Sequence, residues 1–591
     1  MSGRGLSHDT GFVGWCEESG FVGVGGAGSL GSSDRVLFFA RPIDEDFTRQ
    51  HTITGHDMDE TPDADGPAWA GTPSWSGDAA AGLTRTAETV APIIYPPSER
   101  VGNDFHLWDT WLLRERDGSI ATPGGYRVVF ALTAPDDLLP GKRHDVAEIR
   151  CLYSADGREW HDAGPVFADT TPLGSRQWAG SALYDTSGSS ESFESESDTG
   201  TRAAIDDDGR ESERDVCPGD LYVYYTAAGE ADEAELTYSQ RIAAASGGQL
   251  VVDDDGLSVE GPWTHEVLLE PDGEWYETEA QSRGMIYTFR DPWFFEDPAT
   301  GETHLLFEAN VPVAPGSDYC EGDSEAQSFN GCVGVATASD GGPLSFELDP
   351  PLLESVCVNQ ELERPHVIVR DGSYYLFVSS HRHTFAPGYE GFDALYGFRA
   401  DELRGDYQPL NGTGLVLTNP ANAPYQAYSW MAYAHEEAVL VTSFFNYYDL
   451  GGLSLDDVAD LPRSEQFRRF GGTLAPTVRL AVAGEETRVV GTLDHGHLPL
   501  ASEPLPSLRG GGAAARLGGY DRSAPTVFGG DANAMDSGGE SGDRASTTTD
   551  GVGESTTTDG VGESTTTDSV GESTGSDGAQ SSRVDLDTLR P

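Results

Sequence analysis

The chain almost lacks lysine. Among its 591 residues Lys142 is the single lysine and arginine supplies the other basic side chains, whereas aspartate and glutamate together number 99 and the formal net charge is −63. A surface this acidic repels polyanions, which argues against nucleic acids and anionic membranes as partners. Because molar salt shortens the Debye length to about 3 Å and screens such self-repulsion, the composition predicts adaptation to high salt. An ordinary acidic protein with long disordered segments is the alternative.

Long apolar runs are also missing. No stretch approaches the roughly 20 apolar residues of a membrane-spanning helix, and the first residues, MSGRGLSHDTGFVGWCEESG, contain neither a basic segment before an apolar one nor a twin-arginine pair. The six cysteines form no CxxC pair, so we expect no zinc site. Cys320 and Cys332 are close enough in sequence to close a short loop as a disulfide if the protein is exported, and two free thiols are the alternative.

Two segments are too polar to form a packed core. From Ser546 the nonapeptide STTTDGVGE occurs twice and then recurs as STTTDSVGE. Such a repeat buries too little apolar surface to offset the entropy of ordering it, and it lacks the GGxGxDxUx pattern of calcium-binding repeats. We therefore expect a disordered tail over residues 521–591 and a surface insertion at the acidic run 187–215. Residues 1–35 are expected to be a separate, flexible N-terminal segment.

Residues 36–520 are rich in short strands. Segments such as YRVVFALTA, DLYVYYTAAG and HVIVRDGSYYLFVSS are joined by DG, GE or NG turns, which is typical of antiparallel hairpins. Polar clusters recur near Trp108, Trp178, Arg290, Arg364 and Tyr428, at intervals of 70, 112, 74 and 64 residues, and the longest interval contains the acidic run. One polar cluster per repeated sheet favours a β-propeller, whose strand starts line a central channel. A sandwich or barrel also has many short strands but does not so readily produce this spacing.

Carboxylates stand out in three of these clusters. HLWDTW contains Asp109, FRDPWFFEDP contains Asp291, and QELERP contains Glu361 and Glu363. Each has an ordinary explanation, since Asp-Pro often marks a turn and a lone aspartate can cap a nearby amide. In a propeller, however, all three clusters would meet in one pocket. Retaining glycosidases need a nucleophilic carboxylate and a carboxylic acid about 5–5.5 Å apart, and a third carboxylate can hold sugar hydroxyls.

The sequence does not determine the protonation states of Glu361 and Glu363. In an extended segment Glu361 and Glu363 share one face. Crowding of like charges and desolvation raise the pKa of a glutamate, which suits a general acid, but a neighbouring arginine opposes that rise.

The ordered set of motifs resembles glycoside hydrolase family 68, the levansucrases and inulosucrases. WDTW with LRERDG behind it, FRDPWFFEDP, LFEAN, QELERPHV and SSHRHTF follow the family order over roughly residues 36–500, together with ITGHDMDETP, FALTA, QWAGSA and AYSW. The resemblance implies an all-β fold, a five-bladed β-propeller with a central active-site pocket. It also implies sucrose and fructans as partners, a monomer, an extracellular location and no cofactor. The acidic composition suggests a haloarchaeal-type member.

The resemblance also assigns roles, residue by residue. Asp109 would attack the fructosyl C2 of sucrose, Glu363 would protonate the departing glucose and later activate the acceptor, and Asp291 would bind fructose hydroxyls and stabilise the transition state. The residues implied in substrate binding are Trp108, Trp178, Ser181, Arg290, Glu361, Arg364, Arg382 and Tyr428. Fructose would pass to a growing fructan, with levan favoured over inulin, or to water. A mainly hydrolytic sucrase or fructanase and a non-catalytic carbohydrate-binding propeller are the alternatives.

Two positions depart from the family pattern. Ala179 stands where the family commonly has the first serine of Trp-Ser-Gly-Ser, which usually supports the nucleophile, although Ser181 is retained. Gln360 stands where many Gram-positive members have an aspartate that helps to hold calcium. The sequence therefore predicts no metal site.

Overall fold

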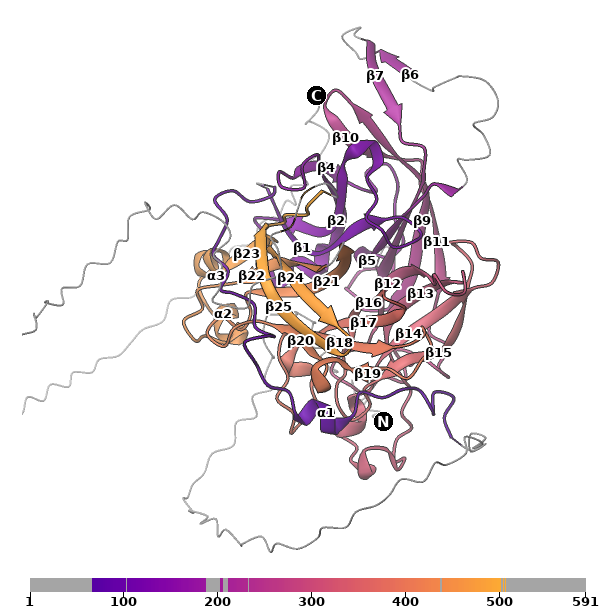
Figure 1. Ribbon diagram of the computed structural model, residues 1–591, viewed down its shortest axis with the longest axis vertical. Coiled ribbons are helices and arrows are strands. Elements are labelled where there is room, and N and C mark those ends of the chain that lie inside the picture. Colours follow the sequence, from indigo (N-terminus) through magenta and orange to yellow (C-terminus); the bar gives the residue numbers. More distant parts are fainter. Residues whose placement is uncertain are drawn as a thin grey trace, which may run out of the picture. The chain divides into compact units, whose positions relative to one another are not determined.

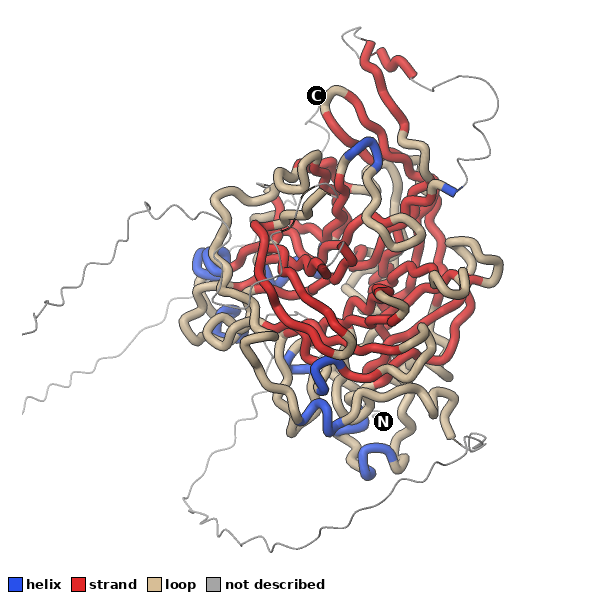
Figure 2. The backbone as a smooth tube through the Cα atoms, viewed as in Figure 1, coloured by secondary structure: helices blue, strands red, loops and turns tan. Residues whose placement is uncertain are grey.

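The computed structural model describes residues 66–102, 104–187, 202–205, 211–231, 233–435, 438–500, 503 and 505. Strands dominate this part of the chain (Figures 1 and 2), and the prediction of an all-β fold is confirmed. The α-helices among the described residues are short: α1 (Gly77–Ala81), α2 (Leu455–Ala459) and α3 (Arg463–Arg469). None of the described helices is long and apolar enough to cross a membrane. The predicted flexible segment 1–35 and the predicted tail 521–591 lie outside the described residues.

The first half of the described chain contains two antiparallel groups of strands. The first group is β1 (Phe105–Arg114), β2 (Arg127–Pro135), β3 (Glu148–Ser154) and β4 (His161–Pro165). The second is β5 (Arg176–Asp185), β8 (Asp220–Ala228), β9 (Gln240–Asp253) and β11 (Thr264–Leu269), with β10 (Gly256–Glu260) also paired to β9. The two groups are joined into one sheet only where β1 and β5 run parallel, over two residue pairs.

Part of the predicted insertion 187–215 is described and forms a hairpin. Its strands are β6 (Arg202–Ile205) and β7 (Glu211–Val216), and the end of β7 pairs with β9. The insertion therefore extends the β9 edge of the second group.

Three further antiparallel sheets follow. The first contains β12 (Phe289–Glu296), β13 (Thr303–Asn310), β14 (Gly331–Ala338) and β15 (Phe346–Glu354). The second contains β16 (Glu363–Arg370), β17 (Ser373–Ser380), β18 (Ala394–Ala400), β19 (Gln408–Pro409) and β20 (Leu415–Thr418). The third contains β21 (Ala427–His435), β22 (Ala438–Tyr447), β23 (Phe470–Leu474), β24 (Pro476–Ala483) and β25 (Glu486–His495). Short 3-10 helices join some of these strands: η1 (Pro123–Gly125), η2 (Pro140–Val146), η4 (Tyr319–Gly322), η5 (Ala326–Ser328), η6 (Arg382–Thr384) and η7 (Leu410–Gly412).

The first strand of each group is an inner strand. β1, β5, β12, β16 and β21 contact one another in that order, and β21 in turn contacts β1. They are buried along almost their whole length, including their polar residues. Polar groups that start these strands therefore face other protein atoms or an enclosed site, not open solvent.

Each inner strand contains a β-bulge near its start. The register shifts lie between Trp108 and Thr110, Trp178 and Gly180, Arg290 and Trp293, Glu363 and His366, and Tyr428 and Met431. Four non-glycine residues at these bulges have positive φ: Asp109 at 42°, Asp291 at 60°, Arg364 at 52° and Ser429 at 56°. A bulge adds an unpaired residue and re-aims side chains, and a positive φ outside glycine is uncommon and strained. The polar clusters seen in the sequence are therefore the bulges.

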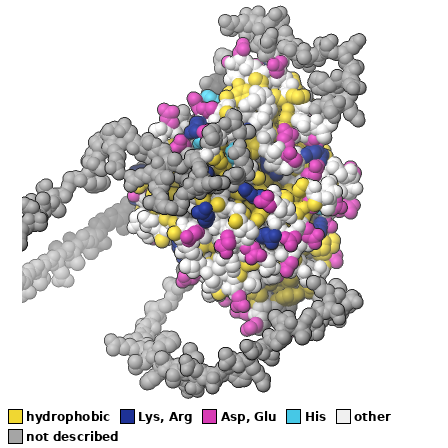
Figure 3. Space-filling view, in the orientation of Figure 1, with side chains coloured by type: hydrophobic (Ala, Val, Ile, Leu, Met, Phe, Trp, Pro, Cys, Tyr) yellow, Lys and Arg dark blue, Asp and Glu magenta, His cyan; other side chains and the backbone are white. Residues whose placement is uncertain are grey.

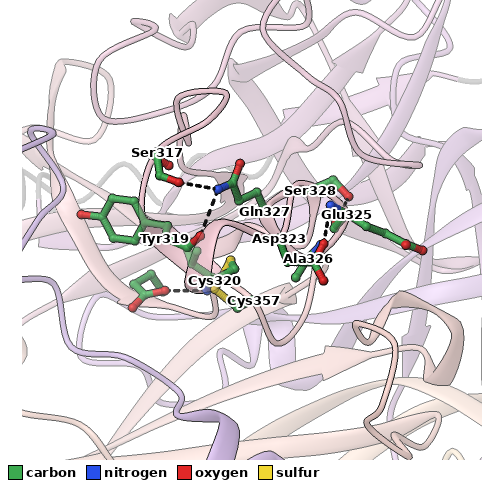
Figure 4. Close-up of a disulfide and its surroundings, with 11 residues drawn as sticks. Ser317, Tyr319, Cys320, Asp323, Glu325, Ala326, Gln327, Ser328 and Cys357 are labelled. Carbon is green, nitrogen blue, oxygen red and sulfur yellow. Dashed lines mark hydrogen bonds between the residues drawn. A yellow bond between two sulfur atoms is a disulfide. The ribbon is translucent and has the colours of Figure 1, made fainter.

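The predicted disulfide between Cys320 and Cys332 is wrong. Cys320 is bonded to Cys357 (Figure 4), and their Cα atoms are 5.5 Å apart. Cys332 lies in β14, fully buried, with Ala309 and Glu354 of the flanking strands as its register partners. The Cys332 side chain packs in a buried apolar cluster, whereas Cys320 and Cys357 lie in connections outside the sheet.

Candidate active site

Polar contacts connect the carboxylates that the sequence singled out. The Arg364 N–H donates to Asp291 Oδ2 at 3.0 Å, and Arg364 Nη1 lies 4.0 Å from Asp109 Oδ1. Arg290 Nη2 donates to Glu363 Oε1 at 3.1 Å. The structure thus brings Asp109 of β1, Asp291 of β12 and Glu363 of β16 into one buried network at the bulged ends of the inner strands.

Arg290 is the centre of this network. Its Nε donates to Glu308 Oε2 of β13 at 2.7 Å, and its Nη2 donates to Glu361 Oε1 at 2.7 Å as well as to Glu363. Burial lowers the pKa of this guanidinium, but attraction by Glu308, Glu363 and Glu361 more than offsets burial, so the pKa of Arg290 is raised. One positive charge therefore serves three buried glutamates.

The glutamates around Arg290 outnumber the positive charge. Burial raises the pKa of Glu308 well above its usual range, and repulsion from Glu361 and Asp291 adds to this, although Arg290 opposes it. Crowded, desolvated carboxylates hold a proton more readily than isolated ones. Such a cluster suits a group that must donate a proton and then take one up.

Asp291, Glu308 and Glu363 each place one carboxylate oxygen within 4.8 Å of the others. Three converging oxygens are a possible cation site. The guanidinium of Arg290, however, already donates to Glu308 and Glu363 and supplies positive charge there. The donor set therefore fits an internal ion pair better than a metal ion, and the absence of a metal stays a prediction.

Arg364 lies beside Asp109, the candidate nucleophile. Its Nη1 donates to Ser429 Oγ at 2.8 Å and its Nη2 donates to the Thr110 carbonyl at 3.1 Å. The side chain is almost fully buried. These bonds tie β16 to β21 and β1 and place a positive charge beside Asp109.

The hydroxyl groups of Ser181 and Thr226 accept hydrogen bonds from the main chain of β12. The Phe294 N–H donates to Ser181 Oγ at 3.0 Å, and the Asp291 N–H donates to Thr226 Oγ1 at 2.9 Å. Thr226 Oγ1 in turn donates to the carbonyl of Ala179 at 3.1 Å, the residue that replaces the family's serine. From this position Ser181 orients the strand that carries Asp291, and its predicted contact with substrate stays a prediction.

The two tryptophans lie next to η2. The Trp178 Nε1–H donates to the His144 carbonyl at 3.2 Å, and the His144 ring meets Trp108 edge to face with centroids 5.3 Å apart. Arg143 lies over the Trp108 ring at 5.4 Å. Both indoles therefore contact residues of η2, and their predicted role as pocket walls stays a prediction.

Tyr428, His381 and Asp393 form a second support for Glu363. The Tyr428 hydroxyl donates to Glu363 Oε2. The His381 ring stacks on Tyr428 with centroids 3.7 Å apart, its Nδ1 is 3.2 Å from Asp393 Oδ2, and its Nε2 is 3.9 Å from Glu363 Oε2. Burial raises the pKa of Asp393, but the charge and hydrogen bond of His381 outweigh burial and lower it overall.

Arg382 is the predicted residue that lies apart from this network. Its side chain is exposed, and its main-chain N–H donates to Asp393 Oδ1 at 2.9 Å. Among the described residues, no hydrogen bond or ion pair joins its guanidinium to the buried carboxylates. Its predicted role in substrate binding is untested.

Sequence reasoning did not assign Glu308, Thr226, His381, Asp393 or Ser429 to the site. Glu308 and His381 belong to the quoted motifs LFEAN and SSHRHTF, so the motifs themselves were a usable signal. Thr226 and Asp393 carry no local signal, because only strand pairing and loop return bring them to the carboxylates.

Gln360, the position that argued against calcium, has a structural role. Its Nε2 donates to the Ile286 carbonyl at 2.7 Å, and its Oε1 accepts the Met285 N–H at 3.2 Å. The amide therefore joins the segment before β16 to the segment before β12, and both of its polar atoms are used by main chain.

Comparison with known proteins identifies this constellation. The family model described as Levansucrase/Invertase, glycoside hydrolase family 68, matches residues 70–499. The solved inulosucrase from Halalkalicoccus jeotgali, bound to kestose, is 62% identical with a TM-score of 0.67, over 74% of this chain and 99% of that one.

Curated relatives agree with this match. Levansucrase LscA of Pseudomonas savastanoi pv. glycinea is 33% identical over 442 residues, 70% of this chain and 92% of the relative. The extracellular sucrase of Zymomonas mobilis is 32% identical over 410 residues, 67% of this chain and 87% of the relative. The chain therefore belongs to glycoside hydrolase family 68, the levansucrase and invertase family.

Proposed function

We propose that this enzyme cleaves sucrose by a retaining double displacement and transfers the fructosyl group to a growing fructan or to water. The observation that carries the proposal is the convergence of Asp109, Asp291 and Glu363 in one buried network, in a chain that belongs to family 68. A non-catalytic carbohydrate-binding protein would not need buried, charge-crowded carboxylates at strained bulges.

In the first displacement Asp109 attacks C2 of the fructosyl unit while Glu363 gives its proton to the glycosidic oxygen, so that glucose leaves. Asp291 accepts hydrogen bonds from fructose hydroxyls and stabilises the positive charge that develops on the ring. Arg364 stabilises the Asp109 anion before attack, since its guanidinium lies 4.0 Å from that carboxylate. Arg290, 3.1 Å from Glu363, holds the acid in place.

In the second displacement Glu363 acts as a base. It takes the proton from an acceptor hydroxyl or from water, whose oxygen attacks C2 and releases Asp109. Repulsion among the glutamates around Arg290 favours protonation of this cluster, whereas Arg290 and the Tyr428 hydroxyl favour the anion. Glu363 thus acts first as an acid and then as a base, held between Arg290 and the Tyr428 hydroxyl.

For the linkage we propose β(2→1), an inulin-type product. The support is the 62% identity with a solved inulosucrase, against 33% with a curated levansucrase. The expectation of levan from the sequence stays untested. Linkage analysis of the polymer made from sucrose decides between them, and a β(2→6) backbone would overturn the proposal.

We also propose that the five groups of strands are the blades of a five-bladed propeller around a central pocket. Two observations support this. The inner strands β1, β5, β12, β16 and β21 contact one another in order, and β21 contacts β1. The large first sheet divides naturally at the two-pair parallel contact between β1 and β5, which leaves five antiparallel groups.

The acidic composition supports adaptation to high salt, and the name of one relative supports an extracellular location. The net charge is −63, and acidic side chains are scattered over the face in Figure 3 with few basic ones between them. One relative is named an extracellular sucrase. We propose a catalytic domain at 36–520, with the tail 521–591 as a solvated spacer and the protein as a monomer.

The test of the reaction uses Asp109→Asn with Asp254→Asn as its control. Asp254 is exposed in the turn between β9 and β10, far along the chain from the network. Loss of a nucleophilic carboxylate typically costs roughly 10³-fold or more in turnover, so glucose release from sucrose in molar KCl should nearly vanish in the first variant and persist in the second. Absence of glucose release by the unsubstituted enzyme at every salt concentration would sink the proposal.

A further inference from the structure

Four aromatic rings form a continuous row that begins beside the nucleophile. Trp108 precedes Asp109, and its ring centroid is 5.3 Å from that of His144; His144 is 6.5 Å from Trp178, and Trp178 is 6.3 Å from Tyr238. The first three rings are buried and Tyr238 is half-buried. The row therefore leads from the reacting carboxylate toward solvent.

The outermost ring of the row, Tyr238, lies in the loop between β8 and β9. This loop, residues 229–239, borders the start of β5, because Ala228 at the end of β8 pairs with Arg176 at the start of β5. His144, the second ring of the row, lies in η2, which connects β2 to β3 and borders the start of β1. Both connections thus flank the bulged ends of β1 and β5, where Asp109 and Trp178 lie.

An ion pair with little solvent exposure holds the 229–239 loop in place. Arg176 Nη1 lies 3.0 Å from Glu233 Oε1, with side-chain exposures of 1% and 7%, and Arg176 Nη2 donates to the Thr237 carbonyl at 2.6 Å. Glu233 also accepts from Ser175 Oγ at 2.6 Å and from the Thr237 N–H at 2.9 Å. Burial raises the pKa of Glu233, but these hydrogen bonds dominate and lower it to about 2. Residues 233–237 of the loop are therefore held in place before any ligand arrives.

The same arginine orients the two outer rings. Its guanidinium lies 5.4 Å from the Trp178 ring centroid and 5.0 Å from that of Tyr238, within the range of a cation–π contact. Leu236, two residues before Tyr238, is 45% exposed. The loop thus presents an aromatic ring beside Trp178 and an exposed apolar side chain, in a segment rich in acidic residues.

We propose that Tyr238, together with Leu236, forms an outer acceptor subsite that binds a fructofuranosyl residue of the growing chain. The inference rests on the proposed function, because only a transferase has an acceptor to hold. A tyrosine offers an apolar face to the C–H groups of a sugar and a hydroxyl to its polar edge. Because Arg176 and Glu233 already order the loop, binding loses little conformational entropy. The subsite keeps the product attached for the next transfer and so lengthens it.

The experiment compares Tyr238→Ala and Tyr238→Phe with Tyr95→Ala, an exposed tyrosine outside the row whose relative exposure is 64%. Each enzyme receives sucrose as donor and short fructo-oligosaccharides as acceptors, and product length and the acceptor KM are measured. A lost stacking contact of this kind corresponds to roughly a three- to tenfold change in equilibrium constant. We expect Tyr238→Ala to raise the acceptor KM by that factor and to shorten the products, with a smaller change in the KM for sucrose. Tyr95→Ala should resemble the unsubstituted enzyme, and Tyr238→Phe, which keeps the ring but loses the hydroxyl, should show a smaller change than Tyr238→Ala.

Leu236→Ser provides an independent arm, since an exposed side chain tolerates this change and the variant should fold. It should also shorten the products, and it decides the matter if Tyr238→Ala does not fold. Unchanged product length and acceptor KM in Tyr238→Ala, or in Leu236→Ser where only that variant folds, would overturn the subsite. Failure of the unsubstituted enzyme to cleave sucrose would instead refute the proposed function, so the two failures are distinguishable.

Discussion

Acid pH should destabilise the framework beneath the active site through His366. This residue lies in β16, two positions after Arg364, and it is fully buried. Its Nδ1–H donates to the Arg364 carbonyl at 2.7 Å, and its Nε2 accepts the Ala432 N–H at 2.8 Å. Only the neutral imidazole makes both bonds, because a protonated Nε2 would point its hydrogen at the Ala432 N–H.

The magnitude follows from proton linkage. Burial lowers the pKa of His366 to about 3, and it lowers that of His106 to about 3 as well, with further repulsion from Arg100 and Arg143. An unfolded histidine titrates near its ordinary pKa of about 6.5. Below that pH the unfolded state binds a proton that the folded state rejects, so the free energy of unfolding falls. The loss is about 1.4 kcal/mol per pH unit for each histidine, or roughly 2 kcal/mol from His366 between pH 6.5 and 5.

The assay is denaturant unfolding at a fixed molar KCl concentration, at several pH values from 7.5 to 5. His366→Gln should be less stable than the unsubstituted enzyme at pH 7.5, because it loses at least one buried hydrogen bond. The difference should shrink by roughly 2 kcal/mol at pH 5, since glutamine does not titrate. His161→Gln, an exposed position on β4, should retain the full pH dependence. A stability difference that does not change with pH would refute the claim that His366 is held neutral.

Two further predictions concern the charge network and the disulfide. Arg290→Met leaves Glu308, Glu361 and Glu363 buried without their shared cation, so it should abolish glucose release and lower the free energy of unfolding by roughly 3–5 kcal/mol; unchanged stability would argue against a buried charge network. Cys357→Ser removes the crosslink to Cys320 and should lower stability by roughly 2–4 kcal/mol. A reductant should lower the unsubstituted enzyme to the same level and leave the variant unaffected, and equal sensitivity of both would contradict this reasoning.

The wrong prediction of the disulfide partner of Cys320 shows the limit of reasoning from sequence. Cys320 and Cys332 are near neighbours in sequence, and proximity along the chain is the only distance that a sequence reports. Cys332 lies inside β14, paired with strands on both sides, while Cys357 returns to Cys320 after β15. The partner was therefore decided by strand register, which depends on packing across the whole sheet.

The residues of the candidate site also fall into two classes, those that the sequence singled out and those that only the structure revealed. Asp109, Asp291 and Glu363 could be singled out from the sequence, because their motifs place acidic residues at strand starts where acidic residues are poor strand formers. Glu308, His381 and Asp393 were not assigned, because their roles depend on contacts that close only when neighbouring strands and loops are in register.

By itself, the sequence determined that this is an acidic, strand-rich protein of family 68 with carboxylates at recurring strand starts. Composition, local alternation and ordered motifs suffice for that, since each is a property of short segments. Only the tertiary structure decided that five inner strands bulge at those positions and that one guanidinium, Arg290, serves three glutamates. Bulges, shared ion pairs and disulfide partners arise from contacts between residues far apart in the chain, and their energies depend on burial that no local segment possesses alone.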